Sequence, residues 1–312
     1  GRQNFLERGW GPIEPFDITL PDVLNKNGIF THIITDHHHY FEVGGEGYCQ
    51  AFKTWDLIRG QEHDRYGSWV KPLKLKKQYM GVMTSQYLAN RQYFNDEEDF
   101  PSCHVFANAC EWINRNKDTD NWMLWVEAFD PHEPFDTPQE FIDLYQDNYA
   151  GPLFIWDKPN KGKIPADALE HIKKRYAATL TMVDKWIGKL LDKFDEYNMW
   201  EDTLVIFTTD HGTMLGEHGW FGKNVMHVYN EIAQIPLIIH YQMDKGAGSR
   251  SSSISQNIDI MPTVLDYYNI SIPDRNRVSG VSLMEACSNK ELKTRECALY
   301  GWYGKAVNMF DG

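Results

Sequence analysis

Residues 204–217 constrain the fold of this chain more than any other segment. The apolar run 204–207 predicts a buried strand, and Asp210 and His211 follow it closely. A carboxylate beside an imidazole at a strand end can hold a divalent cation, and open α/β sheets gather ligands at the carboxyl ends of their strands. The segment therefore predicts an α/β fold with a candidate active site at one edge of its sheet.

Strand and helix patterns alternate along the rest of the chain. Apolar runs predict strands over residues 29–35, 121–129, 203–209 and 235–241. Helical patterns cover residues 18–28, 103–116, 168–194 and 257–269, and the third of these is one long amphipathic helix. This alternation is typical of a mostly parallel central sheet with helices on both faces. We therefore expect that α/β architecture.

Charge and cysteine content narrow the function classes. The formal net charge of −13 argues against nucleic acid as a partner, because binding to phosphate backbones needs a basic surface. No apolar run approaches the roughly 18 residues of a membrane helix, so we expect no membrane partner. The five cysteines are scattered and include no CxxC pair, which favours a cytoplasmic location over a secreted or periplasmic one.

Polar clusters follow three of the predicted strands. Residues 36–40 read Asp-His-His-His-Tyr, residues 130–135 read Asp-Pro-His-Glu-Pro-Phe, and residues 210–212 read Asp-His-Gly. In a parallel sheet these strand ends share one edge, so side chains that are distant in sequence converge there. That convergence, rather than any single cluster, predicts an active site.

Each cluster also has a simpler interpretation when it is taken alone. The three adjacent histidines 37–39 fit a solvated turn or a chance metal chelator. His132 fits a loop histidine bonded to backbone carbonyls, and Asp210 fits a cap for the turn after its strand. A further charged group is interpreted as a solvated or structural ion-pair network: Arg59, Glu62 and Asp64.

Several of these motifs resemble those of one known family. Residues 209–212 (Thr-Asp-His-Gly), followed by residues 215–219 (Leu-Gly-Glu-His-Gly), Lys223 and residues 235–239, resemble the active-site region of sulfatases, in the alkaline phosphatase superfamily. Residues 131–135 are similar to the motif that carries the family's substrate-contacting histidine, and residues 259–265 and 280–283 resemble its downstream landmarks. The resemblance implies an alkaline phosphatase-like fold and hydrolysis of a sulfate monoester.

The resemblance also implies a metal site. Asp210 and His211 would be ligands of a divalent cation, usually calcium in this family, which screens the ester oxygens and polarises the S–O bond. The histidine-rich cluster at residues 36–40 fits zinc or manganese slightly better than calcium. Calcium is the expected ion, with Mn²⁺ and Zn²⁺ as alternatives.

The remaining site residues would handle the sulfate group. By resemblance, Lys223 contacts the sulfate oxygens and the bridging oxygen, and His132 binds sulfate and protonates the leaving alcohol. His39 falls where the family places a histidine that removes a proton when the sulfated intermediate breaks down. His37 stands where many sulfatases have a sulfate-binding lysine, so it is expected to bind substrate with a weaker, pH-dependent charge.

No cysteine of this sequence lies in the signature that carries the family's nucleophile. Sulfatases convert a cysteine or serine in a Cys/Ser-x-Pro/Ala-x-Arg signature to formylglycine, and none of the five cysteines is followed by that pattern. We expect that the chain begins after the nucleophile segment and the first strand of the sheet. Residues 1–285 would then form the sulfatase-like α/β domain, and residues 286–312 the start of a C-terminal α+β subdomain. The polypeptide alone is expected to be inactive.

Two other functions compete with this interpretation. A phosphodiesterase or phosphonate monoester hydrolase of the same superfamily shares the Asp-His-Gly landmark, and a non-catalytic binding protein could keep the fold without the nucleophile. The expected partner is a small sulfated substrate. Aromatic residues in segments 10–16, 48–55 and 154–156 fit stacking on sugar rings, which makes a carbohydrate one option, although packing within the protein explains most such residues.

Overall fold

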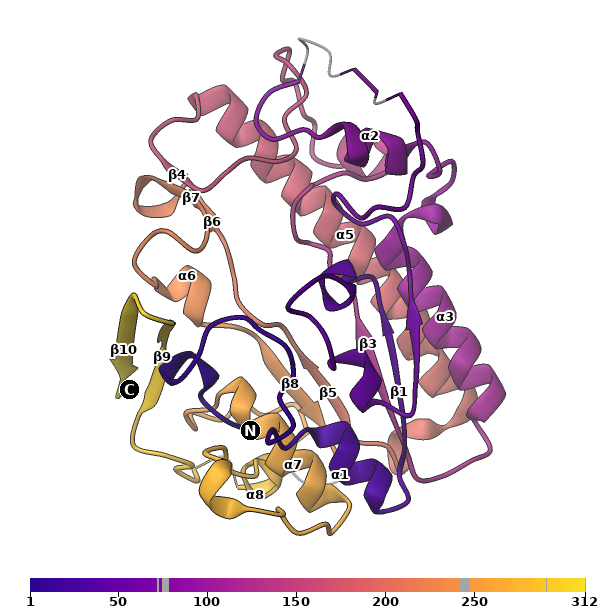
Figure 1. Ribbon diagram of the computed structural model, residues 1–312, viewed down its shortest axis with the longest axis vertical. Coiled ribbons are helices and arrows are strands. Elements are labelled where there is room, and N and C mark those ends of the chain that lie inside the picture. The colour runs from indigo at the N-terminus through magenta and orange to yellow at the C-terminus, as the bar shows by residue number, and fades with distance from the viewer. Residues whose placement is uncertain (72, 75–78, 242–246, 290, 312) are drawn as a thin grey trace.

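The computed structural model describes residues 1–71, 73–74, 79–241, 247–289 and 291–311 (Figure 1). Its helices are α1 (Leu20–Lys26), α2 (Ser85–Arg91), α3 (Pro101–Asn116), α4 (Gln139–Asp143), α5 (Ala166–Tyr197), α6 (Asn230–Ala233), α7 (Ile260–Tyr267) and α8 (Met284–Ser288). Its strands are β1 (Phe30–Thr35), β2 (Thr54–Leu57), β3 (Trp122–Glu127), β4 (Asn160–Lys161), β5 (Val205–Thr208), β6 (Met214–Leu215), β7 (Trp220–Gly222), β8 (Leu237–His240), β9 (Ala298–Trp302) and β10 (Ala306–Phe310).

A parallel sheet with the strand order β2-β1-β3 lies beside the long helices α3 and α5, as Figure 1 shows. The register of β1 and β3 runs from Phe30 opposite Trp122 to Thr35 opposite Glu127. Helix α3 packs against β1, β3 and α5, whereas α1 packs against β1 and α7. The predicted α/β fold with a parallel sheet is therefore confirmed, and the ends of β1 and β3 lie next to each other.

The strand that precedes Asp210 departs from the prediction. Strand β5 pairs antiparallel with β8 in a two-stranded sheet of its own, so it is not hydrogen-bonded to the edge of β3. The reason is that the chain between β5 and β8 returns through the short elements β6, β7 and α6, not through a crossover helix that would bring β8 back parallel. The three polar clusters therefore do not follow one continuous sheet edge.

A cavity of about 1690 Å³ lies between β3 and β5 and is lined by residues of both strands. The two strands are only half-buried as a result, and the side chains of Trp125 and Phe207 are 37% and 42% exposed. The prediction of a buried strand before Asp210 was wrong, because one side of β5 faces this cavity instead of a neighbouring strand.

The long helix α5 confirms the pattern predicted from apolar spacing. It buries Ala168, Ile172 and Met182 on one face and ends at Asn198, which adopts a left-handed conformation with φ 54°. Helix α5 packs against α3. No helix in the described residues is long and apolar enough to cross a bilayer. Helix α1 begins as predicted, because the Thr19 hydroxyl accepts a hydrogen bond from the backbone N–H of Asp22.

The last described residues form a hairpin. Strands β9 and β10 pair antiparallel, and the side chains of Tyr300 and Trp302 pack against a cluster around Met214. The hairpin therefore contacts the body of the fold, and the division at residue 285 stays a prediction. All five cysteines are free.

Candidate active site

A lysine, a histidine and a glutamate form the most tightly bonded group at the cavity. Lys223 directly follows β7, and its Nζ donates to Nε2 of His132 at 2.8 Å and to Oε2 of Glu133 at 3.0 Å. Nδ1 of His132 lies 2.7 Å from the backbone oxygen of Glu133 and donates to it. Because Nδ1 carries the proton, Nε2 is the acceptor for the lysine, which fixes the neutral tautomer of His132.

The charges of this group follow from its burial. Burial and the neighbouring Lys223 ammonium lower the pKa of His132, which keeps the imidazole neutral. Burial alone would raise the pKa of Glu133, but Lys223 and His132 outweigh it and hold the pKa of the carboxyl below its usual range. Lys223 is only 8% exposed and uses two of its three N–H donors on these partners. The third is available to an anion in the cavity.

Asp210 and His211 lie on the other strand that lines the cavity. The Asp210 carboxylate follows β5, is mostly exposed, and approaches Nε2 of His211 at 3.2 Å. The next residue has to be glycine, because a Cβ on Gly212 would lie 1.9 Å from the backbone oxygen of Glu231. That close approach fixes the turn that presents Asp210 to the cavity.

The fit of this pair to a calcium ion is partial. Calcium takes six to eight oxygen ligands, of which the Asp210 carboxylate supplies at most two. No third histidine, cysteine, aspartate or glutamate joins Asp210 and His211 in a ligand cluster within the described ranges. The pair alone therefore supplies too few oxygen ligands for a calcium ion.

Of the three adjacent histidines, His37 faces Glu127, whereas His38 and His39 both face Glu62. The Nδ1 atom of His37 bonds to Glu127 at 2.9 Å, and the His37 ring lines both the large cavity and a smaller one beside Trp10. His39 lines only the smaller cavity; its Nδ1 lies 2.8 Å from Glu42 and its Nε2 lies 3.1 Å from Glu62. The carboxylates of Glu62 and then Glu42 raise the pKa of His39. His38 is buried.

Glu62 is the central carboxylate of this region, which the sequence did not reveal. Arg59 and Asp64 do form the predicted ion pair, at 2.7 Å, but Glu62 turns away from Arg59 and faces the histidines. Its other oxygen lies 3.6 Å from Nδ1 of His132. Burial opposes ionisation, yet the neighbouring imidazoles of His38 and His39 hold the pKa of Glu62 far below its usual range. The Glu62 side chain points inward because its backbone is left-handed, with φ 44°. A glutamate in the sequence does not indicate that conformation.

Two buried carboxyl groups lie beneath the site. Asp36 accepts hydrogen bonds from the Ser102 hydroxyl and the Phe129 backbone N–H, and Asp130 accepts one from the Gln61 side chain. Burial raises the pKa of Asp130 to about 7. Burial, reinforced by Asp130, also raises the pKa of Asp36 well above its usual range.

These buried carboxyl groups predict a pH-dependent stability. The folded chain holds the Asp130 proton up to about pH 7, whereas the unfolded chain releases it near pH 3.8, so the free energy of unfolding falls as pH rises between these values. An Asp130→Asn variant cannot ionise. We expect it to gain about 2–4 kcal/mol over the wild type at about pH 8 and little at about pH 4. Urea unfolding at both pH values measures this difference. An equal gain in the exposed variant Asp118→Asn would contradict the explanation.

Five of the six predicted site residues line the large cavity: His37, His132, Asp210, His211 and Lys223. The sixth, His39, lies beyond His37, with the two rings 5.4 Å apart. Sequence reasoning also missed the functional neighbours Glu127 and Glu133. Glu127 is a charged residue within the predicted strand 121–129, and Glu133 follows His132 in the polar cluster after it; these positions are the signal that could have found them.

Comparison with known proteins identifies the family of this chain. The profile of the Sulfatase family matches residues 4–270, which include all the cavity residues above. The chain belongs to the sulfatase family. This sulfatase chain is 30% identical over 313 residues to the arylsulfatase of Clostridium perfringens, covering 90% of the chain and 64% of that relative. It is 36% identical over 175 residues to the N-acetylglucosamine-6-O-sulfatase of Bacteroides thetaiotaomicron, covering 53% of the chain and 30% of that relative. The chain thus spans less than two thirds of either relative.

Solved structures match the fold of this sulfatase chain over nearly all its length. A protein in complex with its substrate D-glucosamine-2-N,6-O-disulfate superposes with a TM-score of 0.69 at 20% identity, covering 96% of the chain and 72% of that protein. The phosphonate monoester hydrolase of Agrobacterium radiobacter superposes with a TM-score of 0.68 at 17% identity, covering 93% of the chain and 65% of that protein. At these identities the matches show the shared fold alone.

Proposed function

We propose that the natural full-length protein hydrolyses sulfate monoesters at the cavity between β3 and β5. The observation that carries this proposal is the buried contact between Lys223 and His132, at 2.8 Å, in the same cavity as Asp210 and His211. A single ammonium with one free N–H matches a sulfate monoester, which carries one negative charge. Family membership and the two sulfatase relatives support the same reaction.

The residues of this chain bind the anion and supply a proton. Lys223 donates its free N–H to a sulfate oxygen and stabilises the charge that grows on the bridging oxygen as the S–O bond breaks. His132 lies beside that ammonium; because it is neutral, it first takes up a second proton from solvent and then gives one to the departing alcohol. The nearby Glu62 and Glu133 carboxylates favour that protonated state. His37 contributes a ring nitrogen at the edge of the cavity.

Asp210 and His211 are the proposed ligands of a divalent cation, with calcium as the expected ion. When bound, such a cation screens the negative charge of the ester and acts as a Lewis acid. The nucleophile is proposed to be a formylglycine, and none of the five cysteines lies in the family's signature for that conversion.

The superfamily alternative is a phosphonate monoester hydrolase or phosphodiesterase. The Agrobacterium radiobacter enzyme has the same fold. This match is compatible with the alternative but does not distinguish it from sulfate hydrolysis. Both substrate classes carry one negative charge, and they differ in the central atom, sulfur or phosphorus, and in the number of substituents on it. Turnover of both substrate classes by one protein distinguishes them.

We propose a sulfated carbohydrate as the substrate class. Trp10 is 61% exposed, stacks on Tyr48 with 5.3 Å between ring centroids, and lines the smaller cavity beside His37 and His39. An exposed indole beside an anion site offers a flat apolar face to a sugar ring. One relative is named for N-acetylglucosamine 6-O-sulfate, which supports the same class.

Replacement of Trp10 tests the sugar contact. We expect Trp10→Ala to raise KM for N-acetylglucosamine 6-sulfate roughly 10-fold, because about 1–2 kcal/mol of stacking is lost, and to leave KM for a small aryl sulfate within about twofold. Trp69→Ala is the matched control, because Trp69 is 48% exposed and lines neither cavity. Equal losses for both substrates would show that Trp10 supports the loop and not the sugar.

Release of inorganic sulfate tests the reaction itself. The natural protein is expected to release sulfate from N-acetylglucosamine 6-sulfate and to lose that activity when a chelator removes divalent cations. Activity should return when calcium is added back. Sulfate release that is unaffected by thorough chelation would refute the assignment of Asp210 and His211 as cation ligands.

A further inference from the structure

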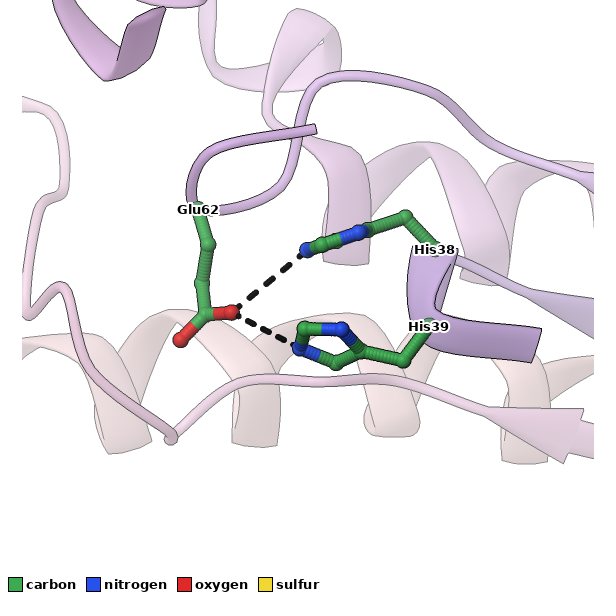
Figure 2. A group of neighbouring side chains, drawn as sticks. All are labelled: His38, His39 and Glu62. Carbon is green, nitrogen blue, oxygen red and sulfur yellow. Dashed lines mark hydrogen bonds and ion pairs between the residues drawn. The ribbon is translucent and has the colours of Figure 1, made fainter. Parts of the chain in front are cut away.

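A second group of potential ligands lies outside the cavity that contains Asp210 and His211. His38 and His39 begin the 3₁₀ turn η2 (His38–Phe41), and both rings point toward Glu62, as Figure 2 shows. The ligand atoms of the three side chains all lie within 4.8 Å of one another. None of the three lines the larger cavity.

The spacing of these atoms fits one small cation. Oε2 of Glu62 lies 3.1 Å from Nε2 of His39 and 3.5 Å from Nε2 of His38. Around a tetrahedral ion with bonds of about 2.0–2.1 Å, neighbouring ligand atoms are about 3.3 Å apart. The two observed distances bracket that value, so an ion could enter with little movement of the three side chains.

His38 provides an independent reason to expect a cation. Its side chain is 3% exposed, and its Nε2 makes no hydrogen bond although it points at the Glu62 carboxylate. A neutral ring with its lone pair at this nitrogen would face a negative oxygen, and a proton there would meet the carboxylate only across a long ion-pair contact of 3.5 Å. A metal ion between the two groups removes both problems.

Glu42 supports the outer side of both rings. Its Oε1 lies 3.5 Å from Nδ1 of His38, and its Oε2 lies 2.8 Å from Nδ1 of His39. A carboxylate on the far nitrogen places the proton there and directs the lone pair of Nε2 inward, an arrangement that commonly orients metal-bound histidines. His39 is therefore held in the tautomer that a metal needs, and the longer contact favours the same tautomer in His38.

We propose that His38, His39 and Glu62 form a zinc-type transition-metal site, separate from the cation site at Asp210 and His211. Two imidazoles and one carboxylate suit zinc, whereas calcium takes oxygen ligands almost entirely. His63, whose Nδ1 lies 3.8 Å from Oε2 of Glu62, is a candidate for the fourth position. A metal here occupies Nε2 of His39 and withdraws that residue from proton transfer.

Zinc binding by the chelator-stripped natural protein tests this site without any activity assay. We expect one zinc ion per chain at this site with a Kd of about 1 µM or lower, and weakening of about 100-fold in His38→Ala and in the near-isosteric Glu62→Gln. Cobalt should bind at the same site and give the visible absorption of a tetrahedral complex. The control is His104→Ala, because His104 lies exposed on α3.

Two results would overturn the proposal. One is the absence of zinc binding in folded wild-type protein, and the other is wild-type affinity in both His38→Ala and Glu62→Gln. Circular dichroism melting shows whether each variant is folded, and Glu62→Gln keeps the volume of the side chain if His38→Ala unfolds. Because the experiment measures zinc affinity, the absence of zinc binding would not contradict the proposed sulfate hydrolysis. In the same way, the absence of hydrolysis would not contradict the proposed zinc site.

Discussion

Replacing Lys223 with methionine is expected to lower kcat/KM for an aryl sulfate by roughly 1000-fold, which corresponds to about 4 kcal/mol of transition-state stabilisation. Lys223 is a buried cation in the cavity, and it is the donor that a sulfate oxygen would meet. Methionine keeps much of the side-chain length and removes only the charge and the donors. The loss should fall mainly on kcat, since the charge on the bridging oxygen grows only as the bond breaks.

Removal of Lys223 also leaves Glu133 without its ion-pair partner, so structural damage has to be separated from catalytic loss. The double variant Lys223→Met/Glu133→Gln removes the unpaired buried charge and is expected to recover the melting temperature but not the activity. Lys173→Met is the matched control, because Lys173 is exposed and pairs with Glu170 on the surface of α5. Recovery of activity together with stability in the double variant would contradict a catalytic role for Lys223.

Asp210→Ala is expected to lower turnover by roughly 100- to 1000-fold and to raise the calcium concentration needed for half-maximal activity by at least about 10-fold. The mostly exposed Asp210 carboxylate makes few bonds within the chain, so its removal costs little folding free energy. The measurement is activity against free calcium for the two proteins.

Asp118→Ala provides the control for this variant, because Asp118 is exposed and its ion-pair partner is Lys117. An unchanged calcium requirement in Asp210→Ala, with activity reduced at all concentrations, would show that Asp210 acts on the substrate or on the turn and does not hold the ion. A turn defect alone should be reproduced by Gly212→Ala, in which the new Cβ meets the Glu231 backbone.

Features with local causes were predictable from the sequence. Helix α5 follows from apolar residues at three- and four-residue steps, and the start of α1 follows from Thr19 and Pro21. His132, Lys223 and Asp210 were identified because each belongs to a short motif of the sulfatase family. These features depend on a few neighbouring residues, so a single sequence contains their full signal.

Features that depend on distant contacts were not predictable. An apolar run such as β5 gives no strand direction, so the antiparallel pairing with β8 and the cavity beside β3 could not be foreseen. Glu62 was interpreted with Arg59 because the two are close in sequence, whereas its partners are histidines more than twenty residues earlier. Its inward direction results from a backbone conformation that glutamate rarely adopts.

The central claim is that Lys223, His132 and Asp210 surround a sulfate ester. The most direct measurement is the ratio of kcat/KM for an aryl sulfate to that for an aryl phosphodiester, made on one preparation of the natural protein with calcium and again with manganese. We predict that the sulfate ester is favoured at least about 100-fold with calcium, a difference of about 3 kcal/mol. Preferential turnover of the phosphodiester with either ion, and no release of sulfate, would contradict the account.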